Sequence, residues 1–75
     1  MESPVHTRPE AWIAHVFSAK AAMRGGVIRR SVAWVRNEIG EDRFVDEVRL
    51  RGFHLLECGG QFVVVCNRAP IRRLV

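Results

Sequence analysis

Two cysteines and three histidines are the side chains whose chemistry would suit a metal or redox centre. His54 and Cys58 are four residues apart, so a strand would place both on one face. A metal site would also need His6 or His15, and the chain has no Cys-x-x-Cys or His-x-x-x-His pair. No Ser-His-Asp set and no phosphate loop can be assembled. We therefore expect no metal, no cofactor and no catalytic residue, and a protein that is not an enzyme.

The two cysteines are not expected to form a disulfide. The chain is expected to turn at Gly59-Gly60. Cys58 then faces Gln61, and Cys66 lies five residues beyond that position. This offset is about 16 Å at the rise of a strand, whereas the Cα atoms of a disulfide are at most ~7 Å apart. Cys66 is expected to be buried and Cys58 exposed.

The basic residues are the main functional signal. The chain has 12 basic and eight acidic residues, a net charge of +4, and Lys20 is its only lysine. The planar fork of arginine suits phosphate, so nucleic acid is the first partner to consider, with DNA favoured over RNA. The alternative is that arginine usage reflects a GC-rich genome and that these charges are only a solvated surface. The predicted phosphate-contacting residues are Arg24, Arg29, Arg30, Arg36, Arg68, Arg72 and Arg73.

The charges are segregated along the chain. Five basic residues and no acid lie from Lys20 to Arg36, whereas five acids and one arginine lie from Glu38 to Glu47. The end of the chain is basic again. A polarised surface follows if these segments lie on different sides of the fold. A second hypothesis is a protein-interaction module or homodimer that uses an apolar hairpin and an acidic third helix.

The length bounds the class of protein. Seventy-five residues form one small domain, expected at 7–67, between a short tail at 1–6 and a basic tail at 68–75. A core of this size supplies little stability, so a homodimer is one way in which the fold could be stabilised further. No apolar run approaches a membrane span, and the first residues do not resemble a signal peptide. We expect a cytoplasmic protein with reduced thiols and no membrane partner.

Three helices are predicted in the first two thirds of the chain. Thr7-Arg8-Pro9-Glu10 is typical of a capped helix start, with a helix reaching Gly25-Gly26. Its apolar positions run from Trp12 to Met23. Ser31 caps a second helix that ends at Gly40, with a two-residue apolar island, Val27-Ile28, before it as a very short strand. A third helix is expected over about 42–51, with Phe44, Val45 and Val48 on its buried face and Gly52 at its end.

Two strands are predicted around the Gly59-Gly60 turn, at 53–57 and 61–66. The core face carries Phe53, Leu55, Phe62, Val64 and Cys66, and the second face carries Leu56, Val63 and Val65. Two apolar faces need two covers, and one of them can be a second subunit. Trp12 and Trp34 are expected in the core. The alternative is that one of them is exposed as an interface anchor or a base-stacking platform.

The fold expected from these elements is α+β, with three helices followed by a C-terminal β-hairpin. The order over about 8–67 resembles that of a winged helix-turn-helix domain, with the hairpin as the wing. The resemblance implies that the third helix enters a DNA major groove and that the wing touches the backbone. The chain departs from that pattern because Glu41, Asp42, Asp46 and Glu47 crowd the third helix. The segment from Lys20 to Arg36 and the tail at 68–73 are the better phosphate contacts.

Two other resemblances concern short motifs. Arg24-Gly25-Gly26-Val27-Ile28-Arg29-Arg30, Arg51-Gly52-Phe53 and the segment 60–67 resemble small bacterial proteins often labelled N-(5'-phosphoribosyl)anthranilate isomerase. That label implies an eight-stranded barrel, which needs roughly 200 residues, so no catalytic residue is carried over. The segment from Glu47 to Val65 resembles HicA-type toxins, which act on RNA. Their histidine after Gly-Ser is absent from Gly59-Gly60-Gln61, so ribonuclease activity is not expected.

Overall fold

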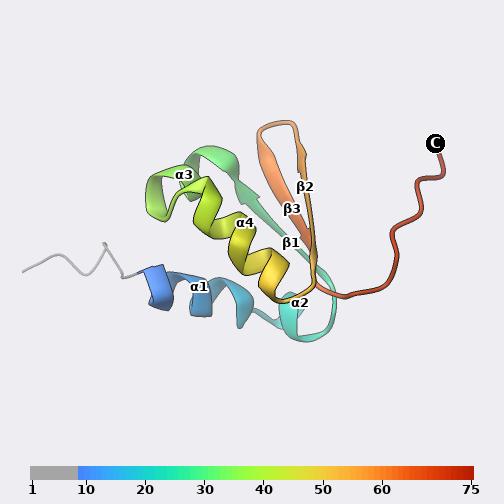
Figure 1. The fold of residues 1–75 in the computed structure, drawn as a ribbon, viewed down its shortest axis with the longest axis horizontal. Helices are drawn as coiled ribbons and strands as arrows, with labels where there is room; N and C mark the ends of the chain where they lie inside the picture. The colour runs from blue at the N-terminus through green and yellow to red at the C-terminus, as the bar shows by residue number, and fades with distance from the viewer. Residues whose placement is uncertain (1–8) are drawn as a thin grey trace, which may run out of the picture.

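The computed structural model describes residues 9–75. Two helical segments precede the first strand, two more follow it, and the described part of the chain ends with two strands and a tail. The longer helices lie on one side of the sheet (Figure 1). The sheet is antiparallel with the order β1-β3-β2, so the last strand is central. The class is therefore α+β. The elements are α1 (Pro9–Phe17), α2 (Lys20–Met23), β1 (Val27–Ser31), α3 (Val32–Glu38), α4 (Glu41–Leu50), β2 (His54–Cys58) and β3 (Gln61–Val65).

The predicted order of three helices followed by a hairpin is wrong, because the strands are interleaved with the helices. The two-residue island at Val27-Ile28 is the start of a five-residue strand, β1, that pairs with β3 along its length. Ile28 is buried on the inner face of this strand. The polar Arg29, Arg30 and Ser31 conceal the rest of the strand in the sequence, because an edge strand tolerates charge.

The predicted first helix is also wrong in its length, because it divides into α1 and α2. Ser18 donates a hydrogen bond from its hydroxyl to the carbonyl of His15, 3.0 Å away. Such a bond competes with helical pairing. Ala19 then leaves the helical region with ψ 151°. Met23, which the periodicity placed on the apolar face, is exposed, whereas Ala22 is buried. The predicted capping box begins at Thr7-Arg8, outside the described residues.

The ends of α3 and α4 follow the sequence signals. The Ser31 hydroxyl accepts a hydrogen bond from the backbone N–H of Trp34 and caps α3. At the other end of α4, Gly52 has φ 75°. The N–H of Phe53 donates to the carbonyl of Val48, and the N–H of Gly52 donates to that of Arg49. These two bonds form the predicted Schellman ending.

The predicted hairpin is confirmed. Cys58 pairs with Gln61 and His54 with Val65. Gly59 and Gly60 both have positive φ, as a two-residue turn requires. The register also directs alternate side chains as predicted: Phe62, Val64 and Cys66 are buried.

The core lies between α1, α3 and α4 on one side and the inner face of the sheet on the other. Phe44 is fully buried, and its ring lies 5.4 Å from that of Phe62 and 6.0 Å from that of Trp12. Trp34 packs against Trp12 with a ring separation of 5.0 Å, but 40% of Trp34 is exposed. The expectation that both tryptophans are in the core is therefore confirmed for Trp12 only. No helix in the described part of the chain is long and apolar enough to cross a membrane.

Candidate nucleic-acid interface

Every arginine of α3, of α4 and of the residue that follows α4 has a carboxylate partner. The Arg36–Glu41 pair joins the two helices across 2.9 Å. The other three arginines pair with acids of α4 itself. These pairs are Arg43–Glu47 at 3.1 Å, Arg49–Asp46 at 3.4 Å and Arg51–Glu47 at 2.6 Å.

Glu47 is the centre of this paired region. Its carboxylate accepts hydrogen bonds from Arg51 and from Arg43, and its side chain is only 18% exposed. The hydrogen bond from Arg51 lowers the pKa of Glu47 below its ordinary value of 4.5, against the opposing effect of burial. The Arg51 guanidinium also lies 4.2 Å from the centre of the Phe17 ring. The Arg51–Phe17 contact ties the end of α4 to α1, and Arg43 also lies 4.0 Å from the carboxylate of Glu10 in α1. Arg51 and Arg43 therefore have a structural role.

The remaining basic side chains in residues 9–75 have no carboxylate within 4.0 Å. All are exposed except Arg30, which is half-buried. Six of them belong to the predicted site, and the other one is Lys20, which was not among the predicted phosphate-contacting residues. Arg36, the seventh predicted residue, is set apart from this group by its pair with Glu41. The group is Lys20, Arg24, Arg29, Arg30, Arg68, Arg72 and Arg73.

Two hydrogen bonds bring the first and last parts of this group together. The Asn67 side-chain amide donates to the carbonyl of Gly25 across 3.0 Å. The N–H of Cys66 donates to the carbonyl of Gly26 across 2.8 Å. Arg24 and Arg68 each adjoin one of these bonded residues, so the fold places them at one end of the sheet. The sequence gives no signal for this contact, because it joins residues 42 positions apart.

Arg29 and Arg30 extend the group along β1. Their side chains start from opposite faces of the sheet, as the alternation of a strand requires. The Arg30 guanidinium donates a 2.7 Å hydrogen bond to the carbonyl of Arg29, which holds the guanidinium next to β1. β1 is an edge strand, and both guanidinium groups are therefore beside the border of the sheet. We call the following residues the basic edge: Arg24, Arg29 and Arg30, on β1 or before it, and Arg68, Arg72 and Arg73, in the tail. The guanidinium of Arg68 lies away from β1, because its Nε donates a 3.3 Å hydrogen bond to the carbonyl of Arg51, just before β2.

The exposed side of α4 has the opposite character. Glu41 and Asp42 occupy its first turn, and Asp46 is exposed one turn later. Asp42 has no basic partner among the described residues. Carboxylates in this position repel phosphate, so the structure supports the expected weakness of α4 as a groove-reading helix.

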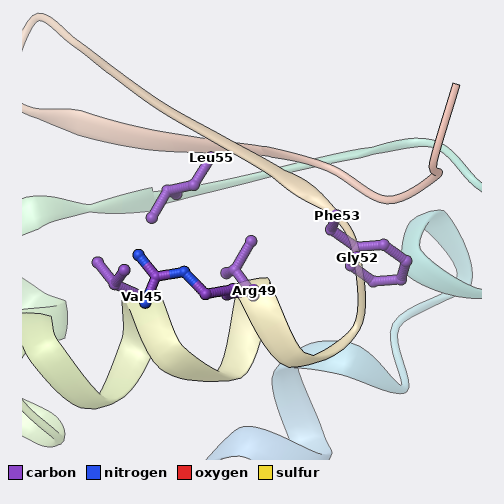
Figure 2. A pocket seen from close by; sticks show the side chains of 6 residues that line it. Val45, Arg49, Gly52, Phe53 and Leu55 are labelled. Carbon is purple, nitrogen blue, oxygen red and sulfur yellow. The ribbon is translucent and has the colours of Figure 1, made fainter. Parts of the chain in front are cut away.

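A cleft of about 540 Å³ lies between α4 and β2, which sequence reasoning missed. Figure 2 shows Val45 and Arg49 on the helix, facing Leu55 on the strand. The walls come from elements that meet only in the fold, so no local motif marks the cleft. Its lining is Val45, Val48, Arg49, Gly52, Phe53 and Leu55.

The cysteines and histidines do not assemble in the described residues, where no three His, Cys, Asp or Glu side chains come close enough to hold a metal. Cys58 is exposed and Cys66 is buried, and both are free thiols. Burial raises the pKa of the Cys66 thiol. His54 makes a 2.6 Å hydrogen bond through Nε2 with the carbonyl of Ala69, which anchors the tail. His6 lies outside the described residues.

The basic edge therefore offers guanidinium donors that no internal carboxylate neutralises, while α4 is acidic and internally paired. Such an arrangement can hold phosphate groups. Comparison with protein-family models, curated proteins and solved structures found no match to this chain.

Proposed function

We propose that this protein is a non-catalytic nucleic-acid-binding module that contacts the phosphate backbone through the basic edge. One observation carries the proposal: the arginines divide into a paired set on α3 and α4 and an unpaired set on β1, its preceding loop and the tail. A guanidinium that has no carboxylate partner keeps its positive charge for an external anion. Arg30, Arg68 and Arg73 each donate one N–H to a backbone carbonyl and keep their other donors for that anion. Phosphate is the polyanion that such a spread of arginines fits.

The proposal includes a winged-helix-like domain with an unusual binding surface. Its support is the order helix, strand, helix, helix, hairpin, in which β1 precedes the second main helix. In the winged-helix resemblance α4 would be the reading helix, but its acidic first turn opposes that role. Binding through β1 and the tail touches the backbone rather than base edges, so we propose weak sequence preference. The resemblance favours duplex DNA over RNA.

The decisive property is salt dependence. Each phosphate that an arginine neutralises releases condensed counterions, and the logarithm of affinity falls by about 0.9 per contact for each decade of salt. Full use of the six residues of the basic edge would give a slope of about −5 on duplex DNA. A surface that only carries solvated charge would give little binding at any salt concentration.

The test is fluorescence anisotropy of labelled duplex DNA and single-stranded RNA at about 50 and 200 mM salt. Arg29→Glu should weaken DNA binding by about fivefold or more, and Arg29→Glu with Arg30→Glu should abolish it. The matched control is Arg36→Glu, which changes the net charge equally but removes an already paired guanidinium. It should stay within about twofold of the unmodified protein. Equal losses for Arg29→Glu and Arg36→Glu would reduce the effect to net charge and overturn the site.

A further inference from the structure

The two edges of the sheet are protected to different degrees. β2 pairs with β3 on one side, and no described strand pairs with its other side. Exposed edges are usually blocked by charge, proline or a bulge. β1 carries two adjacent arginines, whereas β2 has the sequence His-Leu-Leu-Glu-Cys with one charge, Glu57, near the turn. Apart from Glu57, β2 therefore has none of these blocks along its length, and its only hydrogen bond with the tail, in the described part of the chain, is that of His54, its first residue, with Ala69.

The outer face of the sheet next to this edge is apolar. Leu56 is 45% exposed and Val27 is 52% exposed. Val63 lies directly between Leu56 and Arg29, and Val65 lies between His54 and Val27. A strand added at β2 would extend this face and cover part of the Leu56 side chain.

We propose that a second copy of this chain adds to the sheet, with the two β2 strands antiparallel and Leu56 opposite Leu56. This register uses all five residues of β2 and gives a continuous sheet of six strands. The register pairs even-numbered residues with even-numbered ones and odd with odd. The inner faces of the two copies therefore join into one face of the six-stranded sheet, and the outer faces join into the other. The contact has two-fold symmetry, which closes the assembly at two subunits.

Charge complementarity selects this occupant. In the same register, Leu55 lies opposite Glu57 of the second copy. Leu55 and Arg49 line one cleft (Figure 2). The proposed register therefore brings the Glu57 carboxylate of the second copy to the side of this cleft that carries Arg49. Glu57 has no basic partner among the described residues of its own chain, and the Arg49–Asp46 pair is long, at 3.4 Å, between exposed side chains. Because the proposed dimer has two-fold symmetry, the Arg49–Glu57 contact occurs twice.

The alternative symmetric pairing through β1 is opposed by charge. Two β1 strands centred on Arg29 would place one Arg29 directly opposite the other, and like charges in that position are destabilising. Arg29 and Arg30 of the basic edge are therefore on the opposite border of the sheet from the proposed dimer contact. The tail arginines are not, because the His54–Ala69 hydrogen bond holds the start of the tail beside β2. The inference does not depend on nucleic-acid binding, and its test contains no nucleic acid.

The test is sedimentation equilibrium of the full chain, with charge exchange between Arg49 and Glu57. Both side chains are exposed, so substitution leaves the core untouched. Arg49→Glu or Glu57→Arg alone should weaken dimerisation about tenfold, and the two together should restore it to within about threefold. Asp42→Arg, on the helix that carries Arg49, is the control for Glu57→Arg, because both raise the net charge by two; it should leave the dimer constant within about twofold. A monomer at high micromolar concentration, or a dimer insensitive to every exchange, would overturn the proposal.

A covalent test uses the register itself. Leu56→Cys in a Cys58→Ser background should give a disulfide-linked dimer on mild oxidation, because directly opposite Cα atoms are about 4.5–5.5 Å apart. The unmodified Cys58 lies opposite His54 of the second copy, so it should give no comparable product. Failure of the Leu56→Cys variant to cross-link in samples that sediment as dimers would rule out this register.

Discussion

Asn67 donates a hydrogen bond from Nδ2 to the carbonyl of Gly25 across 3.0 Å, and this contact joins the loop before β1 to the start of the tail. Its Oδ1 accepts a second bond, from the N–H of Ala69, also at 3.0 Å. One side chain thus holds two backbone segments that carry Arg24 and Arg68. The proposed interface depends on this contact as well as on the charges themselves.

Replacing Asn67 by alanine removes both bonds without changing the charge. We expect the free energy of unfolding to fall by about 1–2 kcal/mol, because a half-buried carbonyl loses its partner. DNA affinity should fall by about two- to threefold, since the two ends of the basic edge are no longer held together. Denaturant unfolding and anisotropy measure the two effects. Asn37→Ala, on the exposed surface of α3, is the control and should change neither. Unchanged stability of Asn67→Ala would contradict the account of this contact.

Glu47 predicts a specific pH dependence of stability. Its pKa is lowered in the folded state, chiefly by the hydrogen bond from Arg51, so its ionised form stabilises the fold. This contribution is fully present above its ordinary pKa of 4.5 and is lost as the pH falls through the lower folded value. Glu47→Gln should therefore lower stability near neutral pH by about 1 kcal/mol and flatten the acid limb of the stability curve.

The control for Glu47→Gln is Asp46→Asn, which breaks the exposed pair with Arg49. An exposed pair contributes little, so its stability curve should follow that of the unmodified protein. Thermal unfolding at several pH values separates the two variants. Identical acid limbs for Glu47→Gln and the unmodified protein would show that the carboxylate does not stabilise the fold in this way.

Local signals predicted α3, α4 and the hairpin because their information is contained in neighbouring residues. Ser31 specifies a cap, Gly52 a left-handed helix end and Gly59-Gly60 a two-residue turn. β1 was recognised only in part because its pairing with β3 is long-range and because a charged residue, Arg30, occupies an inner-face position and so hides the alternation. The division of the first helix lies at Ser18 and Ala19, where the Ser18 hydroxyl bonds to the carbonyl of His15. Helix propensity alone does not reveal which partner such a hydroxyl takes.

The candidate site was predictable in its composition but not in its arrangement. The i, i+4 spacing of Arg43, Glu47 and Arg51 marks pairs that sequence reasoning can find. The Arg36–Glu41 pair cannot be predicted without the geometry of the turn between α3 and α4. The proximity of the segments that carry Arg24 and Arg68 cannot be predicted without the pairing of β1 with β3. The cleft beside Arg49 has no sequence signature for the same reason.

The two thiols should differ in reactivity. Cys58 is exposed at the hairpin turn, whereas Cys66 is 3% exposed and burial raises its pKa. Because the thiolate is the reactive form, a thiol reagent at neutral pH should modify Cys58 rapidly and Cys66 only as the chain unfolds. Counting modified thiols with and without denaturant tests this. Cys58→Ser should leave no fast-reacting thiol, and a fast phase in that variant would contradict the burial of Cys66.

The central claim is that the unpaired arginines of the basic edge hold phosphate. Its most direct measurement is the salt dependence of duplex DNA affinity, from about 50 to 200 mM, for the unmodified protein and for Arg29→Glu with Arg30→Glu. We predict a steep negative slope for the unmodified protein and a slope shallower by about two contacts, with much weaker binding, for the variant. No binding at the lower salt concentration, or parallel slopes for the two proteins, would contradict the claim.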